Sequence, residues 1–239
     1  MTNQSKMMQI VSCPNYGDYK NIILTEKEIP TPNDNEILVK VSHSAITTAD
    51  TMMRAGTPKF GRLFLGVFKP RNSLLGTGYS GEIVSVGKNI SEYKVGDNIF
   101  GESGLKFSAN AEYVCVDGAG VLYRKPDGLR HDQAACFCDG ALTSYNFIKE
   151  IGQAQEGQKI LINGGAGSLG TSGIQIAKSF GLHVTATSSP SNFDFLKGLG
   201  ADEVLDYKSQ EFLNLESDFD IIYDTVGKMN IEKIQIIDS

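Results

Sequence analysis

A glycine-rich turn between an apolar run and an amphipathic stretch constrains this chain more than any other feature. Residues 159–162 (KILI) are typical of a short buried strand, and residues 171–180 carry apolar side chains at intervals suited to a helix packed on a sheet. Between them, Gly165, Gly167 and Gly170 have the spacing GxGxxG. A strand, a glycine turn and a helix in this order favour a parallel α/β fold with a site for a dinucleotide.

Each glycine of the motif has an expected role. Gly165 would let the chain turn tightly off the strand, Gly167 would let the backbone approach a diphosphate, and Gly170 would let the helix lie close to the sheet. The first N–H groups of the helix and its positive dipole end would then face the anion. The alternative is a glycine-rich turn in an α/β protein that binds no ligand.

The overall composition argues against several classes of partner. The 239 residues are 41% hydrophobic and carry a net charge of −6, which is ordinary for a globular chain and leaves no basic footprint for nucleic acid. No apolar run is long enough to span a membrane, and the polar beginning MTNQSK does not resemble a signal peptide. We therefore expect a small-molecule substrate and no nucleic-acid or membrane partner.

The cysteines indicate a reducing compartment. Four cysteines are few for a chain of this length, so we expect reduced thiols in a cytoplasmic protein. Cys136 and Cys138 lack the spacing of a zinc ligand pair or a redox pair, and both are expected to be small core residues.

The chain changes character near Pro126-Asp127-Gly128. Residues 7–126 contain several short strands separated by glycine turns, which indicates a small β-barrel. Beyond the change, a helical stretch is followed by alternating strands and helices, which indicates a parallel sheet. We predict an α/β protein with two domains, residues 1–127 and residues 128–239. The strands expected in the second domain are residues 159–162, 183–187, 203–205 and 220–226.

One short helix is expected inside the first domain. Residues 47–55 can form a helix that Gly56 ends, and Thr47 suits its N-cap. Asp50 and Arg54 stand four residues apart on one face of that helix, in the register of an ion pair. The stretch that follows, residues 56–72, is expected to be a loop of basic and apolar residues.

With these stretches identified, the chain resembles the medium-chain dehydrogenase/reductase superfamily, on its zinc-free, quinone-oxidoreductase-like side. The matching segments run in the family's order over nearly the whole chain. They are EILVKV (36–41), GEIVSVG (81–87), YKVGDNIFG (93–101), AEYVCV (111–116), ALTSY (141–145), GQKILINGGAGSLG (157–170), LGADEVLDY (199–207) and YDTVG (223–227). The resemblance implies a GroES-like catalytic domain, then a Rossmann domain, with a nicotinamide held between them.

The resemblance also allows zinc to be tested against the residues. Zinc-dependent relatives carry Cys at the position of Thr47 and a His-Glu pair at the positions of Thr77 and Gly78. None of these three side chains can ligate zinc, so no metal is expected. Gly78 replaces an acid frequent in close relatives. Tyr79 beside it could fill the space, either as a wall of the substrate site or as plain core.

The implied catalytic candidates are Thr47 and Asp50, because the segment matching residues 47–54 lines the cleft in relatives. Thr47 would hydrogen-bond the substrate carbonyl, with the proton coming from solvent or from a cofactor hydroxyl. The alternative for Thr47 is a purely structural N-cap. Asp50 with Arg54 would more simply be a structural pair that orients the helix.

The implied positions for the nicotinamide, the pyrophosphate and its ribose lie in three stretches of the second domain. Thr143 would lie near the nicotinamide. The pyrophosphate would be cradled by Ala166, Gly167, Ser168 and Leu169 between the outer glycines of the motif. The ribose side would be formed by Thr225, Val226 and Gly227.

The end of the second strand of this domain predicts the choice of cofactor. It lacks the Asp or Glu that would hold an adenosine ribose diol. Ser188 and Ser189 stand there instead and can donate hydrogen bonds to a 2′-phosphate, with Tyr207 as a neighbour. We therefore expect NADP(H), although the usual Lys or Arg near Asn192 is absent.

Family chains continue past YDTVG through further Rossmann strands, whereas this sequence stops after residues 228–239. In the strand order 3-2-1-4-5-6 we expect strands three, two, one and four only, so that residues 220–226 would form an open edge. Such an edge could support a homo-oligomer. The expected function is zinc-independent, NADP(H)-dependent hydride transfer to a quinone, enone or small carbonyl compound. The alternative is a truncated relative that only binds nucleotide.

Overall fold

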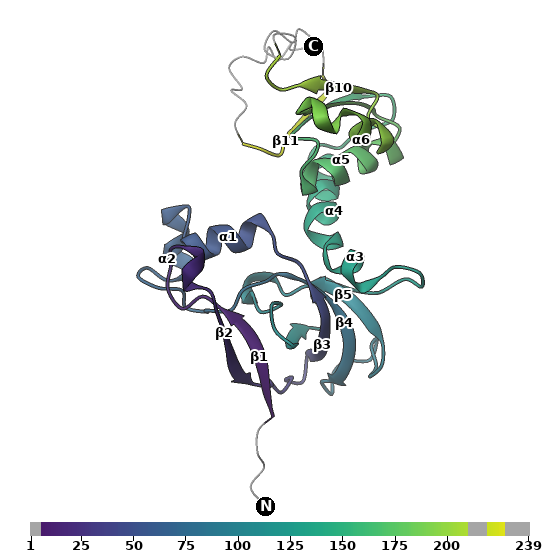
Figure 1. Ribbon diagram of the computed structural model, residues 1–239. Helices are drawn as coiled ribbons and strands as arrows, with labels where there is room; N and C mark the ends of the chain where they lie inside the picture. Colours follow the sequence, from purple (N-terminus) through teal and green to yellow (C-terminus); the bar gives the residue numbers. More distant parts are fainter. Residues whose placement is uncertain (1–5, 210–218, 228–239) are drawn as a thin grey trace, which may run out of the picture. The chain divides into compact units, whose positions relative to one another are not determined.

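The computed structural model describes residues 6–209 and 219–227, and it divides the chain into two compact units (Figure 1). The first unit is Met1–Cys138 and the second is Asp139–Ser239. The division falls within helix α4 (Phe137–Tyr145). The domain boundary expected between residues 127 and 128 stays a prediction.

The first unit is built on antiparallel strands. Five of them form one sheet in the order β6-β3-β4-β5-β7, and β1 pairs with β2 separately. The bounds are β1 Met7–Ser12, β2 Ile23–Glu28, β3 Glu36–Ser44, β4 Gly78–Val86, β5 Asn98–Glu102, β6 Tyr113–Asp117 and β7 Leu122–Arg124. The short strand β7 has no apolar alternation that would have predicted it.

The alternation of apolar residues along β3 places the core of this sheet. Ile37 and Val39 point to one face and are fully buried, and they pack with Ile83 of β4 and Ile99 of β5. Tyr79 is equally buried within the same cluster. Of the two alternatives for Tyr79, the structure therefore supports plain core rather than a wall of the substrate site.

Short helices accompany the sheet. They are the α-helices α1 Thr48–Ala55, α2 Arg62–Leu65 and α3 His131–Ala135 and the 3-10 turns η1 Tyr19–Asn21, η2 Lys59–Gly61 and η3 Gly104–Lys106. Gly56 ends α1 in the left-handed conformation, with φ of 64°, as expected. The stretch 56–72 is not wholly a loop, because η2 and α2 lie inside it; single helical turns of this length leave no periodic signal in sequence.

The second unit contains a parallel sheet in the order β10-β9-β8-β11. Its strands are β8 Lys159–Asn163, β9 His183–Ser188, β10 Glu203–Asp206 and β11 Ile221–Asp224. Numbered along the chain within this unit, the order is 3-2-1-4, as predicted. Its helices are the part of α4 from Asp139 onward, the π-helix η4 Asn146–Ile151, α5 Ser168–Ser179, the 3-10 turn η5 Pro190–Asn192 and α6 Phe193–Gly198.

Helix α5 packs closely on this sheet. Its residues Ile174 and Ala177 are fully buried in one cluster with Ile160 and Ile162 of β8. Gly173 faces the ring of Tyr223 on β11, where an added Cβ would come within 3.3 Å of the ring. Strand β11 pairs with β8, and within the described residues it has no second neighbour. Self-association through this strand stays a prediction.

One of the two cysteine expectations is wrong. Cys138 is buried, and burial raises the pKa of its thiol to about 12. Cys136 is exposed, because it is the C-cap of the short helix α3 and lies on the outer side of that turn. Among the helices that the structure describes, none combines the length and apolar character needed to cross a membrane.

Candidate cofactor and catalytic sites

The tight turn after β8 is made by Gly164, one residue earlier than the motif indicated. Gly164 has φ of 84°, and an added Cβ would lie 2.6 Å from both Thr225 Oγ1 and Val226 Cγ2. Gly165 has no such φ; an added Cβ there would meet Leu196 at 2.9 Å and Ala186 at 3.0 Å. The role predicted for Gly165 in turning the chain is thus wrong, because that turn requires a left-handed residue and Gly165 instead fills a tightly packed position.

The third glycine does what the motif predicts. An added Cβ on Gly170 would lie 2.3 Å from the carbonyl oxygen of Gly164 and 2.6 Å from Cα of Gly165. Only glycine therefore lets the first turn of α5 lie against the preceding turn. Gly167 is the N-cap of this helix, and the residues on either side of it, Ala166 and Ser168, are exposed.

Asn163, at the end of β8, connects three strands, and sequence reasoning had missed it. Its amide Nδ2 donates to Asp224 Oδ1 at 2.8 Å, and its Oδ1 accepts from the Thr187 hydroxyl at 2.7 Å. Thr187 Oγ1 also accepts from the N–H of Gly164 at 3.1 Å. These bonds fix the ends of β8, β9 and β11 at the edge of the sheet where ligands bind in such folds.

The predicted ribose residues lie at the same edge. The Thr225 hydroxyl donates to the carbonyl oxygen of Asn163 at 2.7 Å, which folds the chain after β11 over the end of β8. Asp224 Oδ1 accepts the N–H groups of Val226 at 3.0 Å and Gly227 at 3.1 Å. The structure therefore brings Thr225, Val226 and Gly227 together with the glycine turn.

Hydroxyl groups gather after β9. The buried Ser188 uses its hydroxyl to donate to the carbonyl oxygen of Ser189 at 3.0 Å. Ser189 Oγ lies 3.2 Å from Ser191 Oγ and accepts from Asn192 Nδ2 at 3.1 Å. Ser189, Ser191 and Asn192 therefore form a polar cluster at the surface, of which only Ser189 was predicted from the sequence to contact the cofactor.

Tyr207 follows β10 beside this cluster. Its N–H donates to the carbonyl oxygen of Ser188 at 3.4 Å, because Asp206 pairs with Ser188 between β10 and β9. Lys208 Nζ lies over the Tyr207 ring at 5.4 Å from its centroid. Lys208 is therefore a cation on the turn that follows β10, next to Tyr207.

Thr143 lies half-buried on α4, and its neighbour Ser144 anchors the helix. The Ser144 hydroxyl donates to the carbonyl oxygen of Leu169 at 2.9 Å and lies 3.3 Å from the Tyr223 hydroxyl. Burial raises the pKa of Tyr223. These contacts place the Thr143 turn of α4 next to the glycine loop and β11.

In the first unit, Asp50 is the centre of the predicted catalytic stretch. Its Oδ2 accepts the N–H of Thr47 at 2.8 Å and the Thr47 hydroxyl at 3.3 Å, and its Oδ1 accepts the N–H of Gly76 at 2.7 Å. Asp50 is buried and Thr47 half-buried. Thr47 is the N-cap of α1, so Asp50 both caps the helix and attaches it to the chain before β4.

The ion pair expected between Asp50 and Arg54 is not formed. Arg54 Nη1 donates to the carbonyl oxygen of Gly17 instead, and no ion pair joins these two side chains in the described structure. The reason is that an acid at the third position of a helix reaches back to the N-cap amide, away from the residue four positions later.

Gly78, one of the three positions compared with zinc ligands, is tightly packed, while zinc independence stays a prediction. An added Cβ on Gly78 would lie 2.5 Å from the carbonyl oxygen of Ala135, so α3 leaves no room for a larger side chain. Within the described ranges, no three His, Cys, Asp or Glu side chains gather as metal ligands do. The His131 side chain is hydrogen-bonded to Ser80, with 2.8 Å between Nδ1 and Oγ. Burial, and the nearby side chains of Lys125 and His43, lower the pKa of His131.

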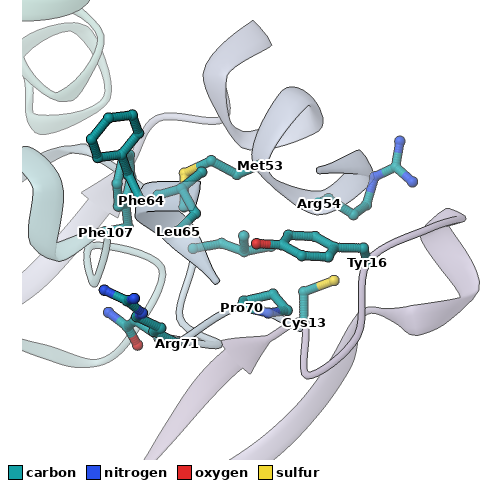
Figure 2. Close-up of a pocket in the computed structure, with 11 residues that line it drawn as sticks. Cys13, Tyr16, Met53, Arg54, Phe64, Leu65, Pro70, Arg71 and Phe107 are labelled. Atoms are coloured by element: carbon teal, nitrogen blue, oxygen red, sulfur yellow. The ribbon is translucent and has the colours of Figure 1, made fainter. Parts of the chain in front are cut away.

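A cavity of about 110 Å³ lies beneath α1 in the first unit (Figure 2). Most of its lining is apolar, and Phe64, Phe107 and Arg71 lie along one side of it, opposite Arg54, whose guanidinium points away. Burial raises the pKa of the Cys13 thiol, which donates to the carbonyl oxygen of Asn15. The lining residues are Cys13, Tyr16, Met53, Arg54, Phe64, Leu65, Pro70, Arg71, Asn72, Leu75 and Phe107.

Comparison with known proteins identifies relatives over most of the chain. Residues 33–150 match the alcohol dehydrogenase GroES-like domain. A trans-enoyl reductase of Aspergillus terreus is 36% identical over 203 residues, which is 81% of this chain and 55% of that protein. A chloroplastic quinone-oxidoreductase homologue of Spinacia oleracea is 32% identical over 231 residues, which is 93% of this chain and 68% of that protein.

A solved structure has the same fold. The quinone oxidoreductase of Coxiella burnetii superposes with a TM-score of 0.80 at 29% identity, over 93% of this chain and 69% of its own. This chain spans about half the length of the Aspergillus relative, 55%. The antiparallel sheet thus corresponds to a GroES-like domain and the parallel sheet to a Rossmann domain. The cytoplasmic location stays a prediction.

Proposed function

Because this chain belongs to the medium-chain dehydrogenase/reductase superfamily, we propose that it is a zinc-independent, NADP(H)-dependent reductase. Its substrate would be a quinone, an enone or a small carbonyl compound. The printed names of its relatives, an enoyl reductase and quinone oxidoreductases, support this class of substrate.

Gly167 carries the cofactor part of the proposal. Its backbone has φ of −80°, which any residue adopts, and an added Cβ would meet nothing nearer than the Gly164 carbonyl oxygen at 3.5 Å. Nothing in the described protein therefore requires glycine at this position, in contrast to Gly164 and Gly170. A bound diphosphate would require it, since a Cβ would stand between the phosphate and the N–H groups at the start of α5. The residues present fit a dinucleotide.

The other cofactor contacts follow from the same edge of the sheet. Ala166, Ser168 and Leu169 would hold the pyrophosphate, and the Thr225 turn would hold the ribose on the nicotinamide side. Ser189 would hydrogen-bond a 2′-phosphate, with the Lys208 ammonium as its counter-charge. When bound, the nicotinamide supplies the hydride.

Thr47 would orient the substrate carbonyl. Its hydroxyl now donates to Asp50 at 3.3 Å, longer than the 2.7–2.8 Å typical of O–H···O bonds, so it can rotate to a substrate oxygen at small cost. Asp50 keeps its place when this happens, because two backbone N–H groups hold its carboxylate. Asp50 is therefore proposed as a positioning residue, and the proton would come from solvent.

Replacement of Gly167 by Ala tests the cofactor part. The variant should melt as the wild-type protein does and bind NADPH at least about tenfold more weakly by calorimetry, since even one charge-assisted hydrogen bond is worth about 1.5–3 kcal/mol. Unchanged affinity would contradict the proposed site. Turnover is measured separately with a panel of quinones, enones and aldehydes. Binding of NADPH without turnover of any of them would favour the alternative of a relative that only binds nucleotide.

Thr47 is tested by comparing Thr47→Val with Thr47→Ser. Serine retains the hydroxyl and should retain kcat, whereas valine should lower kcat about 10–100-fold while NADPH affinity is unchanged. Equal kcat for both variants would leave Thr47 as an N-cap only.

A further inference from the structure

The 57–71 segment (TPKFGRLFLGVFKPR), between α1 and β4, exposes apolar side chains to an unusual degree. Five large ones are mostly accessible: Phe60 71%, Leu63 65%, Phe64 77%, Val67 52% and Phe68 94%. Phe68 is the most exposed large hydrophobic residue of the described chain. A contiguous stretch of this kind marks an interaction surface, whereas single exposed apolar residues do not.

The charges of this segment are all of one sign. No Asp or Glu occurs between Asp50 and Glu82, although the whole chain carries a net charge of −6. The side chains of Lys59, Lys69 and Arg71 are exposed, and none of them has a hydrogen-bond or ion-pair partner among the described residues. The segment is therefore a locally cationic surface on an anionic protein.

The inner side of the segment is fixed to the rest of the unit. Arg62 donates to the carbonyl oxygens of Gly56 at 2.9 Å and Ala55 at 3.1 Å, and its guanidinium lies 4.5 Å from the centre of the Tyr16 ring. The Tyr16 hydroxyl donates to the carbonyl oxygen of Gly66 at 2.8 Å. The backbone that carries the exposed apolar side chains is thus held in place by hydrogen bonds of Arg62 and Tyr16.

The side chains of α2 and of the residues after it differ in the direction they face. Leu65 is half-buried and lines the cavity with Tyr16, while Phe64 lies at one side of it (Figure 2). Leu63 and Phe64 are the exposed residues of the single turn α2, and Val67 and Phe68 follow directly after it. Apolar side chains and free cations therefore alternate along one short stretch of surface.

This combination fits a lipid surface better than a protein partner. Aromatic and aliphatic side chains flanked by Lys and Arg are typical of segments that lie in the headgroup region of a bilayer. Lysine is depleted from the buried part of protein interfaces, yet two of the three free cations here are lysines. The protruding side chains could enter a bilayer without a partner of complementary shape.

We propose that the 57–71 segment docks this protein on membranes that contain anionic phospholipid, with Phe64 and Phe68 inserted at the headgroup boundary and Lys59, Lys69 and Arg71 facing the phosphates. The expectation of no membrane partner rested on the absence of a spanning run, which does not bear on surface binding. The proposal does not depend on the proposed reductase activity, since it concerns a surface of the first unit alone.

Vesicle co-sedimentation tests the docking. The protein should pellet with vesicles of phosphatidylserine and phosphatidylcholine, should not pellet with phosphatidylcholine alone, and should be released as salt is raised. Reversal of three charges in Lys59→Glu, Lys69→Glu, Arg71→Glu should weaken binding at least about a hundredfold, because each cation near an anionic bilayer contributes about fivefold. The matched control is a triple variant with the same change of net charge at exposed positions elsewhere: Lys20→Glu, Lys27→Glu, Lys94→Glu. This control should bind vesicles nearly as the wild type does.

The apolar part is tested by Phe68→Ser against Phe195→Ser. Phe195 is an exposed phenylalanine on α6, so both substitutions remove the same side chain from the surface without opening the core. Phe68→Ser should weaken vesicle binding about tenfold and Phe195→Ser should leave it unchanged. Sedimentation velocity without lipid distinguishes docking from self-association.

Three results would overturn the proposal. The first is an absence of binding to anionic vesicles by the folded wild-type protein. The second is equal loss of binding in the charge-reversed variant and its matched control. The third is a dimer that Phe68→Ser converts to monomer in the absence of lipid, which would assign the surface to a second copy of the chain.

Discussion

Replacement of Asp50 by Ala should destabilise the first unit by about 3 kcal/mol. Two losses combine in this variant. The N-terminal cap of α1 contributes about 1 kcal/mol. The N–H of Gly76, which is buried and donates to Asp50 Oδ1 at 2.7 Å, would lose its acceptor, and leaving such a group unpaired costs about 1–3 kcal/mol.

Asp50→Asn tests how much of this stability depends on the negative charge of Asp50 rather than on the shape of its side chain. An amide keeps one acceptor oxygen and can serve Thr47 or Gly76 but not both, so its cost should be intermediate, about 1–2 kcal/mol. The control is Asp194→Ala, which removes another acidic residue from the first turn of a helix, α6, where it is exposed. That substitution should change stability by less than about 0.5 kcal/mol.

The assay is urea unfolding combined with amide hydrogen exchange, because the two compact units need not unfold together. In Asp50→Ala the exchange protection of the Thr47 and Gly76 amides should fall while that of Ile162 in β8 is unchanged. Full protection of Gly76 in a variant that melts as the wild type does would refute the reasoning, since it would mean that Asp50 does not hold α1 to the chain before β4.

Three further outcomes are expected. Ser189→Asp should reverse the preference for NADPH over NADH, measured as the ratio of dissociation constants, because a carboxylate repels a 2′-phosphate and accepts from a ribose diol; an unchanged ratio would contradict the assignment. Gly170→Ala should cost several kcal/mol, because its Cβ would meet backbone at 2.3 Å, whereas Gly198→Ala on α6, where a Cβ meets nothing within 4 Å, should be neutral or slightly stabilising in the same melt. The pKa of His131 is lowered in the folded protein, so the unfolded chain takes up its proton first: stability should be full above about pH 6.5 and fall below it, and His131→Gln should flatten that part of the profile.

The strand order of the parallel sheet was expected from the Rossmann fold that the resemblance implies, whereas the two kinds of sheet could be predicted from the sequence pattern itself. Buried parallel strands are short apolar runs, and the glycine spacing marks the first crossover, so this information is local. The N-cap at Thr47 and the end of α1 at Gly56 could also be predicted, because helix capping depends on residues within one turn of the helix.

The tertiary structure determined the roles that depend on contacts between residues far apart in the chain. The role of Gly164 depends on Thr225 and Val226, and the role of Asn163 depends on Asp224 and Thr187, at separations that no periodicity records. Tyr207 lies beside Ser188 only because β10 pairs with β9. The capping bond of Asp50 to Thr47 is local, but its second bond, to the N–H of Gly76, is not: a buried carboxylate binds the donors that the fold brings to it, and sequence spacing shows only those on its own helix.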